Sequence, residues 1–408
     1  MDAKEIMQIF EDTAYVRTGG SPEELRCAEY LAERCLAMGL TAKIESFPVE
    51  AAEIQEAVLL ADGVPIPCKG YFCAGSGELE APLYYLTDDD PVSLAGCRDT
   101  IVLVDGHIGY WRFQDIVSHG ALGFITYDGD VNQDHEDIDQ RELRSYFVTD
   151  RKLPGVNVNV KSAMELVRRN VSTAKIVLRQ DEHPGQSRNV VLELPGESDE
   201  FIVFSAHYDS TSLSQGAYDN MSGSVGLLAL AEHFASHPHR FGLRFVWCGS
   251  EERGLLGAKA YAAAHEEELK SCVLNINLDM IGSIMGKFIA CCTSEEKLVH
   301  YIEYMASELG FPVSARQGVY SSDSTPFADK GVPAVSFARL NPRGTGSIHC
   351  RYDTAALLKG EHMVKDIEFI TAFAVRMANA RLCPVGREMP ENMKEELDYY
   401  LLRKRKKK

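Results

Sequence analysis

Residues 201–250 read FIVFSAHYDSTSLSQGAYDNMSGSVGLLALAEHFASHPHRFGLRFVWCGS, and this stretch decides the predicted fold. The apolar run FIVFSAH is typical of a buried strand, SGSVGLLALAEHFAS of a helix, and LRFVWCG of a second buried strand. A strand, a helix and a strand in this order form a βαβ unit with parallel strands. Polar residues that follow such strands meet at one edge of the sheet.

The same alternation of strand-like and helical runs continues on both sides of this unit. Before residue 55 the chain reads as helix, helix, strand, with Ser21 as the cap of the second helix. Pro22 lies in its first turn, and Glu24 is positioned to close a capping box. We therefore predict an α/β fold with a mostly parallel, doubly wound sheet flanked by helices. Further strand-like runs lie at 189–194, 272–280 and 333–339, and further helical patterns at 254–265, 295–310 and 357–380.

Residues 56–186 have a different texture from the rest of the chain. Short β-like runs alternate there with Gly, Pro and acidic turns, and one helical pattern lies near 113–118. We expect an inserted β-rich domain within a main domain formed by residues 1–55 and 187–385. Residues 386–408 are predicted to be a solvated C-terminal tail with a basic end.

Composition excludes several classes of protein. The chain has 408 residues, of which 45% are hydrophobic, and 42 Lys and Arg against 60 Asp and Glu give a net charge of −18. Such an acidic chain repels phosphate backbones, so nucleic acid is not the expected partner. We expect no membrane span and no signal peptide, because no apolar run is long enough and the first residues are acidic. The 11 cysteines, without a CxxC pair, indicate reduced thiols and a cytoplasmic location.

Side chains that can bind metal gather after the predicted strands. Alone, Asp279 could be a helix cap, and Glu251 with Glu252 could charge a helix N-terminus. Taken together, the histidines and carboxylates that follow the predicted strands form a nitrogen and oxygen donor set that suits zinc. The set is large enough for two ions that share a carboxylate. The candidates are His207 and Asp209 after 201–207, Asp219 before the next helix, Glu251 and Glu252 after 243–249, Asp279 after 272–278, and His349 after 333–339.

The ordered motifs HYDS, GAYDNMSG, SEERGLLGAKAY, NLDMIG, SSDSTPF and HCRYDT resemble the co-catalytic dizinc aminopeptidase family. That family includes bacterial leucyl aminopeptidases, and its relatives are glutamate carboxypeptidase, the transferrin receptor and glutaminyl cyclase. The resemblance covers residues 187–380 and the first 50 residues. It implies the zinc exopeptidase fold. The segment 56–186 resembles, less strongly, a protease-associated domain.

The resemblance implies a metal-binding role for each candidate ligand. His207 and Asp279 would bind one zinc ion and Glu252 and His349 the other. Asp219 would bridge the two ions. We therefore expect two zinc ions per chain.

The resemblance also implies roles for residues beside the ligands. Asp209 would hold the other ring nitrogen of His207, which fixes its tautomer. Glu251 would be the general base that deprotonates the bridging water and passes the proton to the leaving amine. Tyr320 would stabilise the tetrahedral oxyanion, and Asp323 would line the substrate pocket.

The expected function is that of a zinc-dependent aminopeptidase acting on peptides with a free N-terminus. Glutaminyl cyclases of this type use one zinc ion, and a carboxypeptidase would need an arginine clamp on the substrate carboxylate. Arg339, Arg343 and Arg351 keep the carboxypeptidase alternative open. An inactive binding protein is the third alternative, against which the complete ligand set and Glu251 argue. No oligomeric state is predicted.

Overall fold

The computed structural model describes residues 1–406, which divide into two compact units. The main unit consists of Met1–Pro48 and the chain from Gln186 onward, and the inserted unit is Val49–Gly185. The chain passes between the units within two long strands, β1 (Lys43–Ala61) and β8 (Thr173–Leu194). Each unit has its own hydrophobic core.

The main unit is built around a mostly parallel sheet with the strand order β13-β12-β14-β11-β9-β10-β8. The four strands β14, β11, β9 and β10 are parallel neighbours, so their carboxyl ends meet at one edge. β12 and β8 flank them in antiparallel orientation. The predicted α/β fold class is confirmed. The strands are β9 (Phe201–His207), β10 (Gly242–Cys248), β11 (Cys272–Leu278), β12 (Lys287–Thr293), β13 (Ser314–Gln317) and β14 (Ala334–Leu340).

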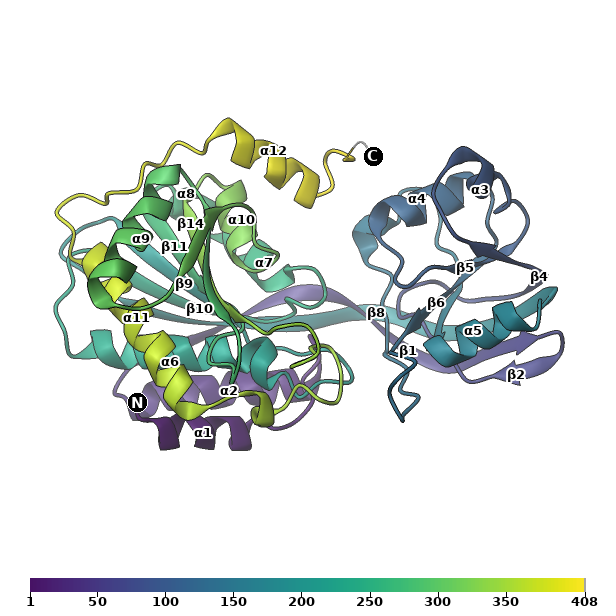
Figure 1. Ribbon diagram of the computed structural model, residues 1–408, viewed down its shortest axis with the longest axis horizontal. Helices are drawn as coiled ribbons and strands as arrows, with labels where there is room; N and C mark the ends of the chain where they lie inside the picture. The colour runs from purple at the N-terminus through teal and green to yellow at the C-terminus, as the bar shows by residue number, and fades with distance from the viewer. Residues whose placement is uncertain (407–408) are drawn as a thin grey trace. The chain divides into compact units, whose positions relative to one another are not determined.

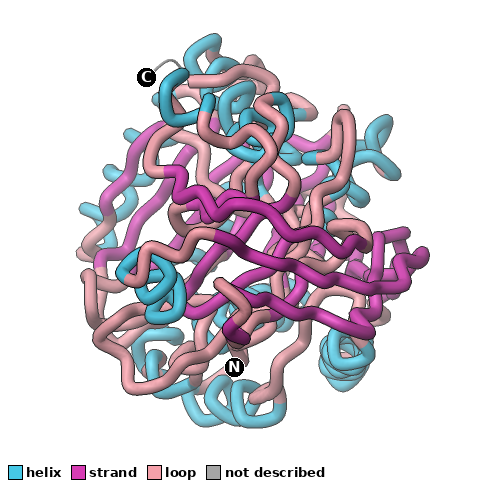
Figure 2. Tube along the Cα trace, turned by 90° about the vertical axis from the view of Figure 1, so that its right-hand side faces the viewer, coloured by secondary structure: helices cyan, strands magenta, loops and turns pink. Residues whose placement is uncertain are grey.

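Helices cover both faces of this sheet (Figure 1; helices are cyan and strands magenta in Figure 2). Alternate residues of β9 enter different cores: Ile202 and Phe204 pack with α1, α2, α6, α9 and α11, whereas Phe201 and Val203 pack with α7 and α10. Burial on both faces explains why these strands are apolar throughout. The helices are α1 (Ala3–Asp12), α2 (Pro22–Ala37), α6 (Ser222–Ala235), α7 (Leu256–Ala264), α8 (Glu266–Leu269), α9 (Glu296–Leu309), α10 (Ser324–Asp329), α11 (Gly360–Ala378) and α12 (Glu391–Tyr400), with the short turns η2 (Ala217–Met221) and η3 (Ala355–Leu357).

The inserted unit is also an α/β structure rather than only β-rich. Its strands follow the order β8-β4-β5-β6-β7-β3, with β2 paired to β1. Helix α5 was not predicted from the sequence. Asn159 caps this helix, and only Ala163 and Leu166 are buried, so its apolar stripe is too narrow to stand out in the sequence. The assignment as a protease-associated domain stays a prediction. The elements are β2 (Val64–Ile66), β3 (Lys69–Gly70), β4 (Gly77–Leu86), α3 (Pro91–Ala95), β5 (Ile101–Val104), α4 (Tyr110–Ser118), β6 (Gly123–Asp128), η1 (Ser145–Phe147), β7 (Gly155–Asn159) and α5 (Val160–Arg168).

The expectation of a solvated C-terminal tail is wrong for α12. Met389, Met393 and Leu397 are buried against Ala328 and Ala334, so this helix is packed onto the main unit. The last two lysines of the basic end lie outside the described residues.

None of the helices within residues 1–406 combines the length and apolar composition that crossing a bilayer requires. All 11 cysteines are free thiols. The cytoplasmic location stays a prediction.

Candidate metal centre

The five expected ligands lie at the carboxyl edge of the main sheet, in two overlapping groups. The last residue of β9, the turn after β10 and the residue after β11 each contribute a side chain, and two loops supply the others. Within each group the ligand atoms lie within 4.8 Å of one another. The first group is His207, Asp219 and Asp279, and the second is Asp219, Glu252 and His349.

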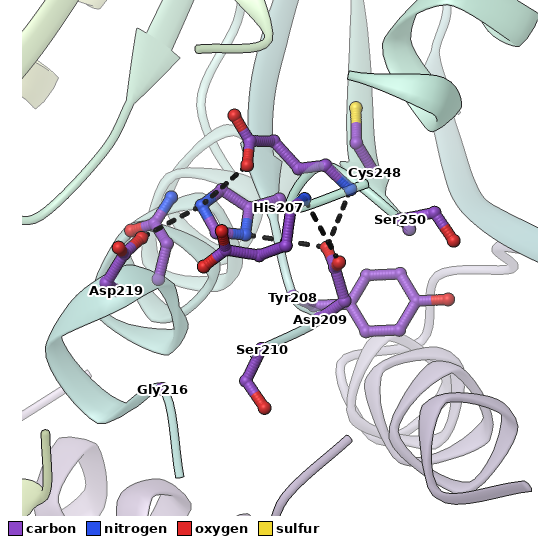
Figure 3. A network of polar contacts seen from close by, with 12 residues as sticks. His207, Tyr208, Asp209, Ser210, Gly216, Asp219, Cys248 and Ser250 are labelled. Carbon is purple, nitrogen blue, oxygen red and sulfur yellow. Dashed lines mark hydrogen bonds and ion pairs between the residues drawn. The ribbon is translucent and has the colours of Figure 1, made fainter. Parts of the chain in front are cut away.

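Asp219 is the residue that the two groups share, and its two oxygens face different histidines. Asp219 Oδ1 lies 3.1 Å from His207 Nε2, and Asp219 Oδ2 lies 3.1 Å from His349 Nε2. His207 Nε2 is also 3.8 Å from Asp279 Oδ1, and His349 Nε2 is 3.1 Å from Glu252 Oε1. Figure 3 shows His207 between Asp219 and Asp209. This arrangement is that of a carboxylate able to bridge two cations.

The electrostatics of the cluster favour added positive charge. Burial raises the pKa of Glu251 well above its usual range and that of Asp279 to about 7. Burial lowers the pKa of His349, but the carboxylates of Glu252 and Asp219 outweigh it and raise that pKa to about 11. Several buried carboxylates therefore surround two imidazoles, and a cation would relieve their mutual repulsion.

A metal ion fits this donor set by a second, independent criterion. Asp279 Oδ1 is buried and accepts no hydrogen bond from any residue that the structure describes. A buried oxygen without a donor is costly, and coordination of a cation would satisfy it. Imidazole nitrogens and carboxylate oxygens are ligands of zinc.

Asp209 contacts both the expected ligand His207 and the turn that follows β10. Its Oδ1 lies 3.5 Å from His207 Nδ1 and accepts a hydrogen bond from Glu251 N at 2.9 Å. Its Oδ2 accepts one from Glu252 N at 3.3 Å. Glu251 Oε2 is 3.9 Å from His207 Nε2, yet Glu251 belongs to neither ligand group. The structure thus places Glu251 beside the ligands but outside both groups.

Asn220 is a positioning residue that sequence analysis missed, although it lies in the quoted motif GAYDNMSG. Its Nδ2 donates to Leu278 O at 2.9 Å, and its Oδ1 accepts from Met280 N at 3.0 Å. Asn220 therefore holds the residues on both sides of Asp279. The neighbouring Gly223 permits this approach, since a Cβ there would lie 2.2 Å from Leu278 O.

Asp353 was also missed, although the motif HCRYDT contains it. Its carboxylate accepts hydrogen bonds from Tyr218 N at 2.8 Å, from Asp219 N at 3.2 Å and from Ser214 Oγ at 3.2 Å. The side chain is fully buried, and burial raises its pKa to about 6. Asp353 thus links the loop of His349 to the main chain of the shared ligand.

We expect Asp353→Asn to lower zinc affinity roughly tenfold to a hundredfold, as the loss of groups that orient ligands usually does. The amide oxygen of the variant can accept a hydrogen bond from one of the two main-chain N–H groups, of Tyr218 and Asp219. The NH₂ group would face the other, so one of these two hydrogen bonds is lost. Competition with a chromogenic chelator measures the affinity. Asp130→Asn, on the inserted unit, is the matched control, and equal affinity of the two variants would refute the role of Asp353.

Arg17 fixes the loop between β9 and η2 from beneath. The side chain is fully buried and donates hydrogen bonds to the carbonyl oxygens of Tyr208, Gln215 and Gly216, the last at 2.8 Å. The main-chain N–H of Arg17 donates to Ser210 Oγ at 3.1 Å. The N-terminal segment therefore holds the loop that leads from His207 to Asp219.

Glu24 differs from its expected role in a capping box. Ser21 Oγ does accept from Glu24 N at 3.1 Å, but the Glu24 carboxylate turns away from Ser21. It accepts from Ser187 Oγ at 2.6 Å, from Gly20 N at 3.0 Å and from Ser250 Oγ at 3.4 Å. The Glu24 carboxylate therefore contacts Ser250, the residue before Glu251, and it is fully buried.

Burial raises the pKa of Glu24 from its ordinary 4.5 to about 7, with Asp209 adding to this effect and Arg188 opposing it. Between these values the folded protein binds more protons than the unfolded chain, so stability falls as pH rises. Between pH 4.5 and 7 we expect the free energy of unfolding of the wild type to fall by up to about 3 kcal/mol relative to that of Glu24→Gln. Urea unfolding of both proteins across this range measures the difference, and a difference independent of pH would be contrary to this account.

Tyr320 and Asp323 lie on the loop between β13 and α10. Burial raises the pKa of Tyr320, and the charges of Asp279 and Asp219 add to this shift. Asp323 is fully buried, and burial raises its pKa to about 7. Cys248 lies beside it. The substrate-pocket role of Asp323 stays a prediction.

Fold and site together define an α/β domain with two overlapping groups of metal-binding side chains at the carboxyl ends of parallel strands. Residues 189–373 match the family model described as Peptidase family M28. The predicted resemblance of this part of the chain to that peptidase family is confirmed.

Two curated relatives are aminopeptidases by name. Aminopeptidase YwaD of Bacillus subtilis is 35% identical over 150 residues, which are 35% of this chain and 33% of YwaD. Leucine aminopeptidase 2 of Trichophyton rubrum is 37% identical over 97 residues, which are 23% of this chain and 20% of that protein. The matches thus span a third or less of these relatives.

Two solved structures share the fold over nearly the whole chain. One is BSAP, a zinc aminopeptidase from Bacillus subtilis, with a TM-score of 0.78 and 22% sequence identity. The match covers 95% of this chain and 98% of the BSAP chain. An aminopeptidase from Aneurinibacillus sp. strain AM-1 has a TM-score of 0.77 at 21% identity and covers 94% and 96%.

Proposed function

We propose that the protein is a zinc-dependent aminopeptidase that removes N-terminal residues from peptides. The observation that carries this proposal is the pair of ligand groups that share Asp219, with Glu251 beside them and outside both. The match of residues 189–373 to the Peptidase family M28 model and the names of the curated relatives support it.

Two zinc ions fit the ligands. His207 and Asp279 would hold one ion and Glu252 and His349 the other, with Asp219 shared. When bound, the ions would supply Lewis-acid activation of the scissile carbonyl and of the attacking water.

The side chains around the ligands would handle the proton and the developing charge. Glu251 would take a proton from the attacking water and return it to the leaving amine. The Tyr320 hydroxyl would donate a hydrogen bond to the oxyanion that develops on the scissile carbonyl. Asp209 would keep the Nδ1 proton of His207 in place, so that Nε2 remains a ligand atom.

One of the three arginines that could bind a substrate carboxylate in a carboxypeptidase is already paired within the protein. Arg339 Nε donates to Asp366 Oδ2 at 2.8 Å, and Nη2 pairs with Oδ1, so the guanidinium is engaged in a bidentate ion pair. Its Nη1 donates to Gly286 O at 3.0 Å. Arg339 therefore supports the loops around the site instead of facing a substrate carboxylate.

A panel of aminoacyl chromogenic substrates with free and blocked N-termini tests the proposal. We expect hydrolysis of the free substrates alone, loss of activity with a strong chelator, and recovery when zinc is restored. Activity that survives chelation would contradict the metal assignment. Hydrolysis of blocked substrates with a free C-terminus would favour a carboxypeptidase, and cyclisation of N-terminal glutamine a cyclase.

A further inference from the structure

The C-terminal helix α12 packs onto α10 of the main unit (Figure 1). Met389, Met393 and Leu397 are buried against Ala328 of α10 and Ala334 of β14. Beyond the helix, Arg403 forms a bidentate ion pair with Asp329, at 2.6 and 2.7 Å. The helix is therefore anchored along its length.

Two side chains of α12 reach the loop between β13 and α10, on either side of Tyr320. Glu396 Oε2 accepts a hydrogen bond from Val319 N at 3.2 Å. Tyr400 Oη and Ser321 Oγ lie 2.7 Å apart in a hydrogen bond. Because both bonds come from a helix packed on a buried core, they restrict the backbone that carries Tyr320.

The same loop is hydrogen-bonded at its other side to β11, the strand that ends one residue before Asp279. Ser322 Oγ accepts a hydrogen bond from Asn277 Nδ2 of β11 at 3.0 Å. Thr325 Oγ1 donates to Tyr320 O at 2.8 Å. The loop is thus held between α12 and β11.

We propose that α12 is a clamp that positions Tyr320 for the reaction, with Glu396 and Tyr400 as positioning residues. This inference rests on the proposed function, in which Tyr320 stabilises the oxyanion. A hydrogen bond to the oxyanion forms fully only in the transition state, so its misplacement lowers kcat and leaves KM nearly unchanged. A loop that lost both contacts with α12 would present the phenol in several positions, of which few are productive.

The test compares two matched double variants of the zinc-loaded, full-length protein. The clamp variant is Glu396→Ala with Tyr400→Phe. The control is Glu395→Ala with Tyr399→Phe, which removes the same groups from a hydrogen bond within α12. We expect the clamp variant to lower kcat roughly tenfold, with KM and zinc content unchanged and the control unaffected.

Dependence on Tyr320 separates a positioning role from a merely structural one. In a Tyr320→Phe background, the clamp variant should lower kcat no further, because the hydroxyl that it positions is absent. A further tenfold loss in that background, or equal kcat in clamp and control variants, would overturn the inference.

Hydrogen–deuterium exchange gives a readout that does not need activity. The amides of residues 319–322 should exchange faster in the clamp variant than in the control, because Val319 N loses its acceptor. If the wild type hydrolyses no peptide, the proposed function fails, and exchange alone then decides whether α12 holds this loop. Equal exchange in the two variants would refute the clamp itself.

Discussion

Glu251→Gln is expected to lower kcat by a factor of about 10²–10⁴ while zinc content and KM stay near those of the wild type. The amide keeps the shape of the side chain but cannot accept the proton of the attacking water. Glu251 belongs to neither ligand group, so the ions should remain bound. Steady-state kinetics and metal analysis of the same preparation check both parts of this expectation.

Glu252→Gln is the matched comparison at the next residue. Glu252 Oε1 lies 3.1 Å from His349 Nε2 in the second ligand group, so this change should deplete one zinc ion. If Glu251→Gln loses zinc and Glu252→Gln keeps it, the roles of base and ligand are reversed. If neither variant changes rate or metal content, the dizinc assignment fails.

His207→Ala and His349→Ala should each remove one zinc ion and lower kcat/KM by at least about a thousandfold. Each change leaves a ligand group with two protein side chains, too few to hold zinc firmly. The two variants should differ in stability, because the His207 side chain is 1% exposed and that of His349 is 40% exposed. Thermal unfolding of the metal-free proteins should therefore show a larger loss for His207→Ala.

His237→Ala is the control for these changes, because His237 lies at an exposed position beyond α6. It should keep full zinc content and activity. Full zinc occupancy in either ligand variant would show that the corresponding group is assigned wrongly.

The ligand cluster could be predicted from sequence because parallel strands deliver their carboxyl ends to one edge. His207, the Glu251–Glu252 pair and Asp279 follow directly from β9, β10 and β11. His349 was found through the resemblance and its place after β14. Its loop has no periodic pattern that would direct the side chain to the cluster.

Apart from Asp209, the residues that support the cluster from other parts of the chain could not be found in this way. Asp353 contacts the main chain of Tyr218 from 135 residues away, and Glu24 contacts Ser187 from 163 residues away. Such pairings depend on tertiary packing, which a local pattern does not encode. Arg17 was missed for the same reason, since its acceptors are main-chain oxygens that any sequence would offer.

The packing of α12 illustrates a different limit. Its buried residues Met393 and Leu397 lie four residues apart, which fits a helical period, and Met389 is buried just before the helix. The surrounding charged residues and the basic end favoured a solvated tail instead. A narrow apolar stripe is ambiguous in sequence, because only the surface of α10 shows what it packs against.

Zinc stoichiometry tests the central claim most directly. The full-length protein is loaded with zinc and separated from excess metal by gel filtration. The number of zinc ions per chain is then measured by inductively coupled plasma mass spectrometry. The two ligand groups that share Asp219 lead us to expect two zinc ions in the wild type and one in His349→Ala. One ion or none in the wild type would contradict the dizinc centre.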